Sequence, residues 1–335
     1  MMRIVKLDRA RNLPDEWDRA ADHYFQKRAF LAHCETGNPC RQRYYVARQD
    51  KRLVAGAVVY SLRLSLLTFA RIDLPVSMQI VGIPCSVSHP GLIGSTVAAR
   101  NLLDHIRGQE RGFLLALNLE TSELIPDGFT AAKTLPTVAL EPAVQSWDEF
   151  LSSMRADYRR RVNKILARSG GLKIRDSACE EFSREHHDLY LQVWGRSDAK
   201  LEKLTLEFFK GLPAEFRMIT AHHGDDLAGW AIILETRGGL DFFLGGIDYD
   251  LNREQAVYLR LLLEIVRTGI ESGASRVDLG QTAEIPKMRL GATCRALHMG
   301  ATHGNPFFRF LLHRASGFLE YRRRVPGHHV FGVQP

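Results

Sequence analysis

The sequence predicts a mixed α/β fold in which one structural unit occurs twice. Residues 43–63 and 217–237 each contain an apolar strand, a polar turn and a second apolar strand entered through Ala-Gly, which is the pattern of a β-hairpin. Each hairpin is followed by a segment of helical periodicity, at residues 95–107 and 255–267, and then by a short apolar strand. This repeated order within 335 residues favours an internal duplication, with a mixed sheet in each copy.

A helix is predicted between the two copies, over residues 146–169. Ser146 and Glu149 form the S-x-x-E pattern of a capping box, and the Gly170-Gly171 pair ends the helix. Apolar residues between them repeat at spacings of three and four: Trp147, Phe150, Leu151, Met154, Tyr158, Val162 and Ile165. Further helices are predicted over residues 180–194 and 204–212.

These elements divide the chain into four predicted parts. An N-terminal domain covers residues 1–145, and a basic connector helix covers residues 146–171. A C-terminal domain, which holds the candidate active site, covers residues 172–305, and a basic aromatic tail covers residues 306–335. We expect the tail to dock onto the second domain, with an anionic membrane surface as the alternative.

Positive charge is concentrated in two segments of the chain. Lysine and arginine number 45 against 38 acidic residues, a net charge of +7, and residues 151–175 alone carry eight basic residues against one acid. A second group lies in the tail, where only Glu320 is acidic: Arg309, Arg314, Arg322, Arg323 and Arg324. The first group predicts an anionic partner along residues 155–168, either tRNA or a membrane surface, with a solvated face left open as the alternative. DNA is not expected.

Composition also bears on the cellular location and on metal binding. No apolar stretch approaches the roughly 18 residues of a membrane-spanning helix, and the first residues lack an apolar signal segment. The five cysteines are scattered without a C-x-x-C pair. We expect a cytoplasmic protein with reduced thiols, with peripheral attachment at the inner face of the membrane left open. Adjacent histidines, as in the three His-His pairs, point apart, so no metal site is expected.

Residues 240–300 hold the densest set of residues that could support chemistry. A strand reaches Gly245-Gly246 and is followed by a polar turn and a long helix, whose first N–H groups and positive dipole end attract anions. The next strand ends at Asp278, and the loop after it contains Lys287 and Arg289. The patterns GxxxxGK[ST] and GxGxxG are absent here, which argues against a P-loop or a dinucleotide-binding fold.

The segments LGGIDYDLNREQAVYLRLLLEIVRTGI, GASRVDLG and KMRLGA together resemble a known family. They are similar to the acetyltransferase-like proteins that belong with the Fem-type aminoacyl transferases, in the acyl-CoA N-acyltransferase (GNAT) superfamily. The matching residues are Asp278, Leu279, Gly280, Lys287, Arg289 and Gly291, and the resemblance covers most of residues 40–300. It implies tandem GNAT-like domains and N-acyl transfer, in which an amine attacks an acyl-CoA thioester or an aminoacyl-tRNA ester. Catalysis in the superfamily rests on positioning and on polarisation of the carbonyl by backbone groups.

The motifs and the resemblance assign candidate roles to individual residues. Asp278 is the candidate base or amine-orienting residue, and Tyr258 the candidate general acid. Candidate cofactor-binding residues are Gly245, Gly246, Asn252, Arg253, Gln255, Lys287 and Arg289. Candidate substrate-binding residues are Gln281, Tyr249 and Trp194. Structural alternatives stay open: capping or ion pairing for Asp278, and core packing for Tyr258 and Trp194.

The predicted function is transfer of an acyl group to an amine. The donor is acyl-CoA, acting as a co-substrate, or another activated acyl carrier, and no tightly bound cofactor is expected. The acceptor is an amino group of a small molecule or of a cell-envelope precursor. Two alternatives remain: a tRNA-dependent aminoacyl transferase of the Fem type, and a non-catalytic binding protein with a GNAT fold.

Overall fold

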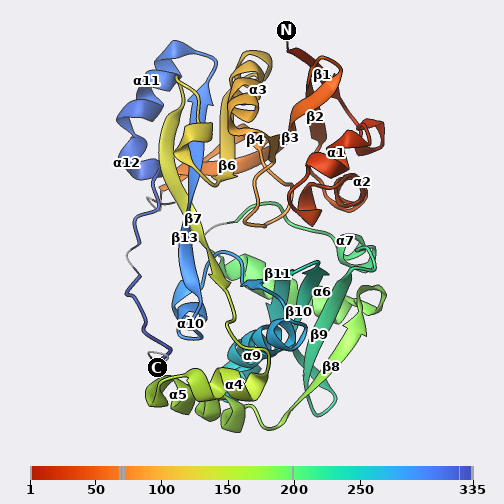
Figure 1. The fold of residues 1–335 in the computed structure, drawn as a ribbon, viewed down its shortest axis with the longest axis vertical. Coiled ribbons are helices and arrows are strands. Elements are labelled where there is room, and N and C mark those ends of the chain that lie inside the picture. Colours follow the sequence, from red (N-terminus) through yellow and green to blue (C-terminus); the bar gives the residue numbers. More distant parts are fainter. Residues whose placement is uncertain (1, 68, 70–71, 198–199, 324, 333–335) are drawn as a thin grey trace. The chain divides into compact units, whose positions relative to one another are not determined.

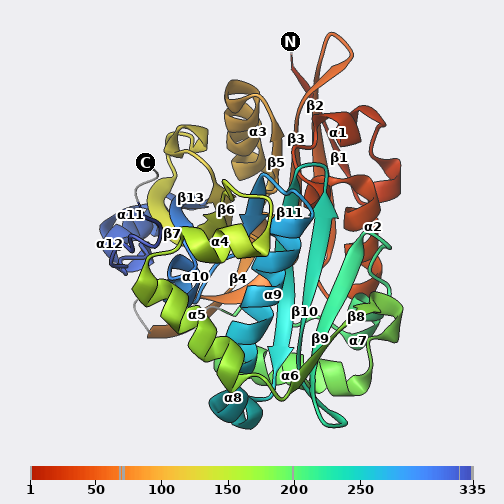
Figure 2. The same cartoon turned by 60° about the horizontal axis from the view of Figure 1, so that its bottom comes forward.

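The computed structural model describes residues 2–67, 69, 72–197, 200–323 and 325–332 and divides the chain into two compact units (Figures 1 and 2). Unit 1 consists of residues 1–136, 198–204 and 296–323, and unit 2 of residues 137–197, 205–295 and 324–335. Strands β7 (Thr130–Leu140) and β13 (Thr293–His303) contribute residues to both units. The mixed α/β fold class predicted from the sequence is confirmed.

Unit 1 contains a mixed sheet in the order β1-β2-β3-β4-β6-β13. Its strands are β1 (Arg3–Leu7), β2 (Gln42–Gln49), β3 (Arg52–Leu67), β4 (Ile72–Val81) and β6 (Phe113–Leu119), and β5 (Leu92–Gly94) pairs with β3. The β4–β6 pair is parallel, whereas the other pairs described along this order are antiparallel. The predicted hairpin at residues 43–63 is therefore present as β2 and β3.

Helices cover this sheet and close the first apolar core. They are α1 (Glu16–Ala20), α2 (Arg28–Gly37), α3 (Thr96–Gln109), α11 (Pro306–Arg314) and α12 (Ser316–Leu319), with one-turn 3₁₀ helices at Ala10–Asn12, Tyr24–Gln26 and Ser122–Leu124. Ser95 caps α3 by accepting from Ala98 N. One face of α3, with Leu102, Leu103 and Ile106, packs in a cluster with residues of β3 and β6. This is the helix predicted at residues 95–107.

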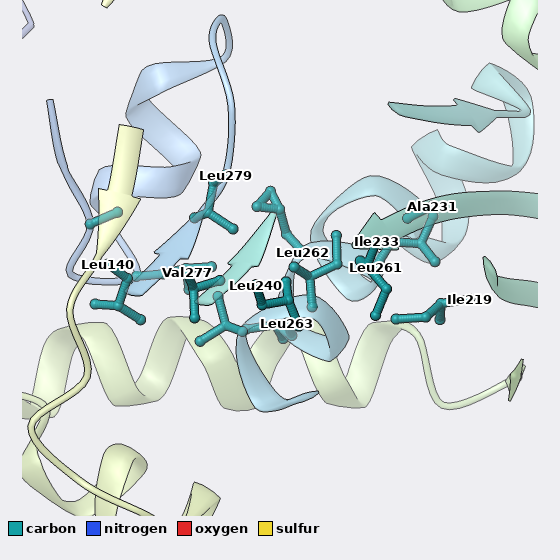
Figure 3. Packing of buried hydrophobic residues seen from close by; sticks show 14 of the residues in the cluster. Leu140, Ile219, Ala231, Ile233, Leu240, Leu261, Leu262, Leu263, Val277 and Leu279 are labelled. Atoms are coloured by element: carbon teal, nitrogen blue, oxygen red, sulfur yellow. The ribbon is translucent and has the colours of Figure 1, made fainter. Parts of the chain in front are cut away.

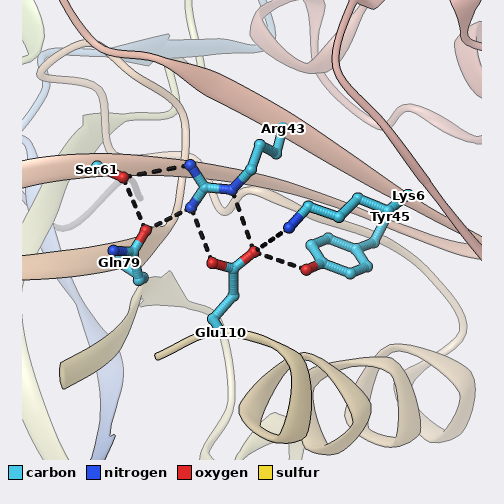
Figure 4. Close-up of polar contacts among 6 residues, drawn as sticks. All are labelled: Lys6, Arg43, Tyr45, Ser61, Gln79 and Glu110. Atoms are coloured by element: carbon cyan, nitrogen blue, oxygen red, sulfur yellow. Dashed lines mark hydrogen bonds and ion pairs between the residues drawn. The ribbon is translucent and has the colours of Figure 1, made fainter. Parts of the chain in front are cut away.

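A partly buried ionic network joins the end of α3 to strands β1 and β2 (Figure 4). The Glu110 carboxylate accepts bonds from Tyr45 Oη at 2.6 Å, Lys6 Nζ at 3.0 Å and two nitrogens of Arg43 at 3.1 Å. Burial alone would raise the pKa of Glu110, but these hydrogen bonds and the Arg43 charge outweigh it and lower the pKa. Arg43 extends the network to Ser61 and Gln79. We assign this cluster a structural role.

Unit 2 contains a sheet in the order β7-β12-β11-β10-β9-β8. Its strands are β8 (Leu172–Ala178), β9 (Phe216–His223), β10 (Asp226–Thr236), β11 (Gly239–Ile247), β12 (Arg276–Asp278) and the last residues of β7. Only the β11–β12 pair is parallel among the pairs described here. Its helices are α4 (Trp147–Ser153), α5 (Ala156–Arg168), α6 (Arg184–Arg196), α7 (Leu206–Lys210), α8 (Tyr249–Gln255), α9 (Val257–Glu271) and α10 (Glu284–Met288), with a 3₁₀ turn at Cys179–Glu181.

The core of unit 2 forms around α9 (Figure 3). Leu261, Leu262 and Leu263 of this helix are at most 3% exposed and pack in one cluster with Leu240 of β11 and Val277 of β12. The apolar stripe that predicted a helix at residues 255–267 is therefore the surface that packs against the sheet.

The predicted helix over residues 146–169 is wrong in one respect, because the chain forms two helices there. Ser146 caps α4 as predicted, but Met154 and Arg155 adopt extended conformations and separate α4 from α5. Arg155 N donates to Val330 O at 2.8 Å, and Met154 pairs with Phe331 in a short β-bridge. The break is thus satisfied by residues far away in the sequence, which periodicity does not reveal.

The two units also divide the chain differently from the predicted boundaries. Both α4 and α5 belong to unit 2, and residues 198–204 belong to unit 1. Residues 306–323 of the tail lie in unit 1, where Leu312 and Leu319 pack in one cluster with Met299 of β13. The expectation that the tail docks onto the second domain is therefore wrong for α11 and α12. It holds for Val330 and Phe331, while Arg324 lies outside the described residues.

Candidate functional site

The candidate site of unit 2 begins where the short strand β12 ends. Strands β11 and β12 pair in parallel at three positions, the last of which joins Asp241 and Asp278. β11 then continues beside β10, and the register between these two strands shifts so that Phe243 forms a bulge. A bulge bends its strand and is common beside active sites. The chain after Asp278 turns to β7 instead, where Leu279 N donates to Val138 O.

Asp278 is buried at this strand end and is held by three donors. Its side chain accepts from Thr137 Oγ1 at 3.0 and 3.1 Å, from Gly280 N at 2.8 Å and from Arg276 Nη2 at 3.0 Å. A carboxylate offers about four acceptor sites, so these donors fix its orientation while leaving capacity for another donor. Of the two readings of Asp278 that the sequence left open, the ion pair is present with Arg276, and contact with an amine stays a prediction.

Lys287 lies on α10 and reaches back to the loop that follows Asp278. Its Nζ donates to Gly280 O at 3.2 Å and to Gln281 O at 2.8 Å. Burial lowers the pKa of Lys287 to about 8, although the negative charges of Asp278 and Glu284 act in the opposite direction. The Lys287 ammonium group therefore holds two carbonyl groups of this loop, and its pKa lies well below the ordinary value for lysine.

Glu284 connects this loop with Tyr258 on α9. It is 1% exposed at the start of α10, directly after Thr282 and Ala283, whose φ angles are +60° and +47°. Such left-handed conformations cost about 1 kcal/mol or more for residues other than glycine and concentrate at functional sites. Burial first, and then the charge of Glu284, raise the pKa of Tyr258 well above its ordinary value. The tyrosine hydroxyl therefore keeps its proton at neutral pH.

A short helix, α8, forms within the turn before α9 that was predicted to bind an anion. α8 meets α9 at Ala256, which adopts a left-handed conformation with φ +49°. Asn252 Oδ1 accepts from Tyr258 N at 2.9 Å, so this side chain caps the first turn of α9. Arg253 is exposed and lies 3.6 Å from Asp250, and Gln255 is the last residue of α8. One of the N–H groups expected to face a ligand thus already has a partner.

Both glycines that were predicted to bind a cofactor, Gly245 and Gly246, lie where the backbone packs closely against its neighbours. A Cβ at Gly246 would lie 2.5 Å from Trp230 Nε1 and 2.8 Å from Tyr190 N of α6, and a Cβ at Gly245 would lie 2.9 Å from Trp230 O. The close approach of α6 to β11 therefore accounts for Gly246 without a ligand.

The remaining predicted residues lie on other elements or at the rim. Trp194 is half-buried on α6, and Tyr249 begins α8 with the guanidinium of Arg196 3.7 Å from its ring centre. Arg289 is exposed at the end of α10, and Gln281 contributes its carbonyl oxygen to Lys287. The structure therefore brings Asp278, Gln281 and Lys287 together in one loop, whereas Tyr258 on α9 is related to this loop through the charge of Glu284.

Two members of this cluster were not predicted from the sequence. Thr137 precedes the site by 141 residues, and no local pattern points to it. Glu284 stands three residues before Lys287, at the spacing of neighbours on a helix. The E-x-x-K pattern after a strand end would have indicated it.

In the described residues, neither a hollow nor a group of metal-binding side chains adds to this site. A hollow of about 280 Å³ in unit 1 lies beside β2, and one of about 520 Å³ in unit 2 lies beside β8. Neither is lined by the predicted site residues. Within the described ranges there is no group of three or more histidine, cysteine, aspartate or glutamate side chains that could hold a metal ion, and no helix is long and apolar enough to cross a membrane.

Comparison with known proteins agrees with this architecture. The model of the acetyltransferase (GNAT) domain family matches residues 152–287. The crystal structure of FemX superposes with a TM-score of 0.56 at 11% identity, covering 92% of this chain and 99% of FemX. A tandem GNAT protein from the clavulanic acid biosynthesis pathway superposes with a TM-score of 0.49 at 12% identity, covering 91% of this chain and 99% of that protein. The L-PGS structure from Bacillus licheniformis superposes with a TM-score of 0.48 at 13% identity, covering 85% of this chain and 95% of the L-PGS chain. No curated protein matches the sequence.

The family match and the similarity to FemX place the fold among the GNAT acyltransferase folds. Residues 152–287 match the model of the acetyltransferase (GNAT) domain, and the fold of the chain is similar to that of FemX. The FemAB-like resemblance predicted from Asp278, Lys287 and their neighbours is thereby confirmed at the level of the fold.

Proposed function

We propose that this protein is an N-acyltransferase, which moves an acyl group from acyl-CoA or another activated carrier to an amino group. The acceptor is a small molecule or a cell-envelope precursor. The observation that carries the proposal is the buried Asp278–Lys287 arrangement at the strand end inside a GNAT domain. Perturbed, buried ionisable groups at the end of a sheet strand are typical of reaction sites.

The proposed chemistry needs a polarised carbonyl and a path for one proton. The acceptor amine attacks the acyl carbonyl carbon, the C–N bond forms, and the bond from carbon to the donor sulfur breaks. Backbone N–H groups of β11 beyond Asp241 polarise the carbonyl oxygen. Asp278 orients the amine or takes its proton, and Tyr258 supplies a proton to the departing sulfur. Lys287 holds the carbonyls of residues 280 and 281 and so shapes the loop.

A second donor class is favoured by two observations. The exposed face of α5 carries Arg160, Arg161, Lys164 and Arg168, with Asp157 as its acidic partner at Arg160. In the first turn of α9, the Tyr258 N–H group donates to Asn252 and is therefore not available to a pyrophosphate. Both features suit an aminoacyl ester carried on tRNA, in which case the bond that breaks is carbon to oxygen. Binding to tRNA would then weaken steeply with rising salt.

Calorimetric titration of the full chain tests the proposal. The ligands are acetyl-CoA, palmitoyl-CoA, free CoA and a mixture of aminoacylated tRNAs at two salt concentrations. We expect one donor class to bind, and Lys287→Met to weaken that binding about tenfold or more because a charged hydrogen-bond donor is lost from the loop. Lys210→Met, at the exposed end of α7 and outside the basic segment of residues 151–175, is the matched control and should bind like wild type.

The outcomes separate the alternatives. Binding of a CoA ester with release of free thiol in the presence of amines supports the CoA-dependent reaction. Salt-sensitive binding of aminoacylated tRNA without CoA binding supports the Fem-type reaction. Binding of none of the four ligands overturns the proposal in favour of a non-catalytic GNAT-fold protein.

A further inference from the structure

Exposed apolar side chains of unit 1 gather on one short stretch of the chain. Of the eight large apolar side chains that are exposed in the described residues, five lie between residues 307 and 318. They are Phe307, Phe308, Phe310, Leu311 and Phe318, and Phe307 and Phe310 are more than 60% exposed. The other three, Val5, Leu74 and Val97, lie apart from one another in the sequence. Contiguous exposed apolar surface of this kind marks an interaction site.

The stretch is a well-anchored element of the fold. Asn305 caps α11 by accepting from Phe307 N at 2.8 Å, and Leu312 is buried in a cluster with residues of β13. Phe308 also packs edge-on against Phe113, with ring centres 5.8 Å apart. Figure 1 shows α11 and α12 following each other beside β13. One side of the element therefore holds it to unit 1, so the exposed aromatic side is not needed for packing within the unit.

The charge around the aromatic side chains is positive. Arg309, His313, Arg314, Arg322 and Arg323 lie in or directly after the two helices. The single acid between residues 304 and 323 is Glu320, which accepts from Arg322 Nε at 3.1 Å. A symmetric contact with a second copy of the chain would bring these like charges together, which disfavours self-association. An anionic surface with an apolar layer beneath it matches both the charge and the aromatic side chains.

We propose that α11 and α12, together with the arginines beside them, dock on an anionic lipid membrane. Phenylalanines of an interfacial helix enter the boundary between headgroups and acyl chains, and arginines bind lipid phosphates in the plane above. At nine residues α11 is about 13 Å long, too short to span a bilayer core of about 30 Å, so it lies on the surface. This inference is independent of the proposed acyl transfer, because it concerns another unit and uses none of the site residues.

Vesicle co-sedimentation of the full chain tests the proposal. One set of vesicles contains phosphatidylcholine alone, and the other contains equal parts of phosphatidylcholine and phosphatidylglycerol. We expect binding to the anionic set, weakened by high salt because surface charges are screened. The variant Phe307→Ser, Phe310→Ser, Phe318→Ser should lose binding to the anionic set. The variant Arg314→Gln, Arg322→Gln should bind more weakly, by about fivefold for each charge that is removed.

Matched controls keep the outcomes distinct. Val97→Ser removes an equally exposed apolar side chain from α3, and Arg160→Gln, Arg161→Gln removes two charges from α5. Both should bind anionic vesicles like wild type, and thermal unfolding should show that every variant is folded. The proposal is overturned if wild type does not bind anionic vesicles, or if only the α5 variant loses binding. It is also overturned if light scattering shows a wild-type dimer that the phenylalanine variant dissociates.

Discussion

Single residues in the loop after β12 carry most of the buried charge in unit 2. Asp278, Glu284 and Lys287 are 4%, 1% and 2% exposed. Removing such groups from water is unfavourable unless each one gains partners. Here Asp278 receives three donors, and Lys287 gives hydrogen bonds to two carbonyl oxygens. We therefore expect the loop to hold one conformation as long as these contacts are complete.

Lys287 should make the stability of the protein depend on pH in the alkaline range. Burial sets its folded-state pKa at about 8, against an ordinary value of 10.5. Between these values the unfolded chain holds a proton that the folded chain has lost, so this lysine adds stability as the pH rises. In Lys287→Met the rise should be absent, and the difference in unfolding free energy from wild type should change by about 3 kcal/mol across the interval.

Urea unfolding at a series of pH values measures that difference. Lys173→Met is the control, since its side chain is exposed on β8 and should follow wild type. Parallel curves for wild type and Lys287→Met would show that the buried amine does not titrate in this range.

How far the site could be predicted depended on the kind of contact each residue makes. Asp278 and Lys287 stand in a local pattern of a strand end followed by a loop, so the motif and the family resemblance were enough to select them as candidates. Thr137 contacts Asp278 from a strand 141 residues away, and nothing in its own neighbourhood indicates that contact. Gly246 was assigned to a ligand because glycine lets the backbone approach a ligand closely, whereas the atoms closest to its position belong to Trp230 and Tyr190. A glycine needed for packing and one needed for binding look alike in a sequence.

At the level of secondary structure, the packing of α6 on β11 should depend on Gly246. Gly246→Ala would place a methyl group 2.5 Å from Trp230 Nε1 and 2.8 Å from the backbone nitrogen of Tyr190, which cannot move independently of its helix. Overpacking of this kind costs about 1–3 kcal/mol. We expect the urea midpoint of the variant to fall accordingly.

Gly239→Ala in the same strand is the matched control for this prediction. The nearest atoms to a Cβ there are Thr236 Oγ1 at 3.4 Å and Arg276 O at 3.6 Å, so it should change stability by far less. Equal midpoints for the two alanine variants would mean that α6 is free to move away from the strand.

Regular elements were predictable wherever their own residues specify them. Both hairpins and the helices α3 and α9 follow from periodicity within about twenty residues, and each is present. The interruption between α4 and α5 was not predictable, because Met154 continues the apolar stripe of a single helix. It arises from pairing with Phe331, almost at the other end of the chain.

On the scale of the whole molecule, each unit has a large apolar cluster of its own in the described residues. Leu102 of α3 lies in the cluster of unit 1, and Leu262 of α9 lies in the cluster of unit 2. Both side chains are at most 1% exposed. Chains with more than one core commonly depart from two-state unfolding. We therefore expect the units to open in separate steps.

Hydrogen exchange of two cavity-forming variants tests this division. Leu102→Ala and Leu262→Ala should each lower the free energy of opening by about 2–5 kcal/mol in the unit that loses the side chain. Amides of α3 and β6 should exchange faster in the first variant, and amides of α9 and β12 in the second, with protection elsewhere unchanged. Because the two leucines share no cluster, the double variant should show the sum of both effects. Faster exchange in both units from either single variant would show instead that the chain unfolds as one cooperative structure.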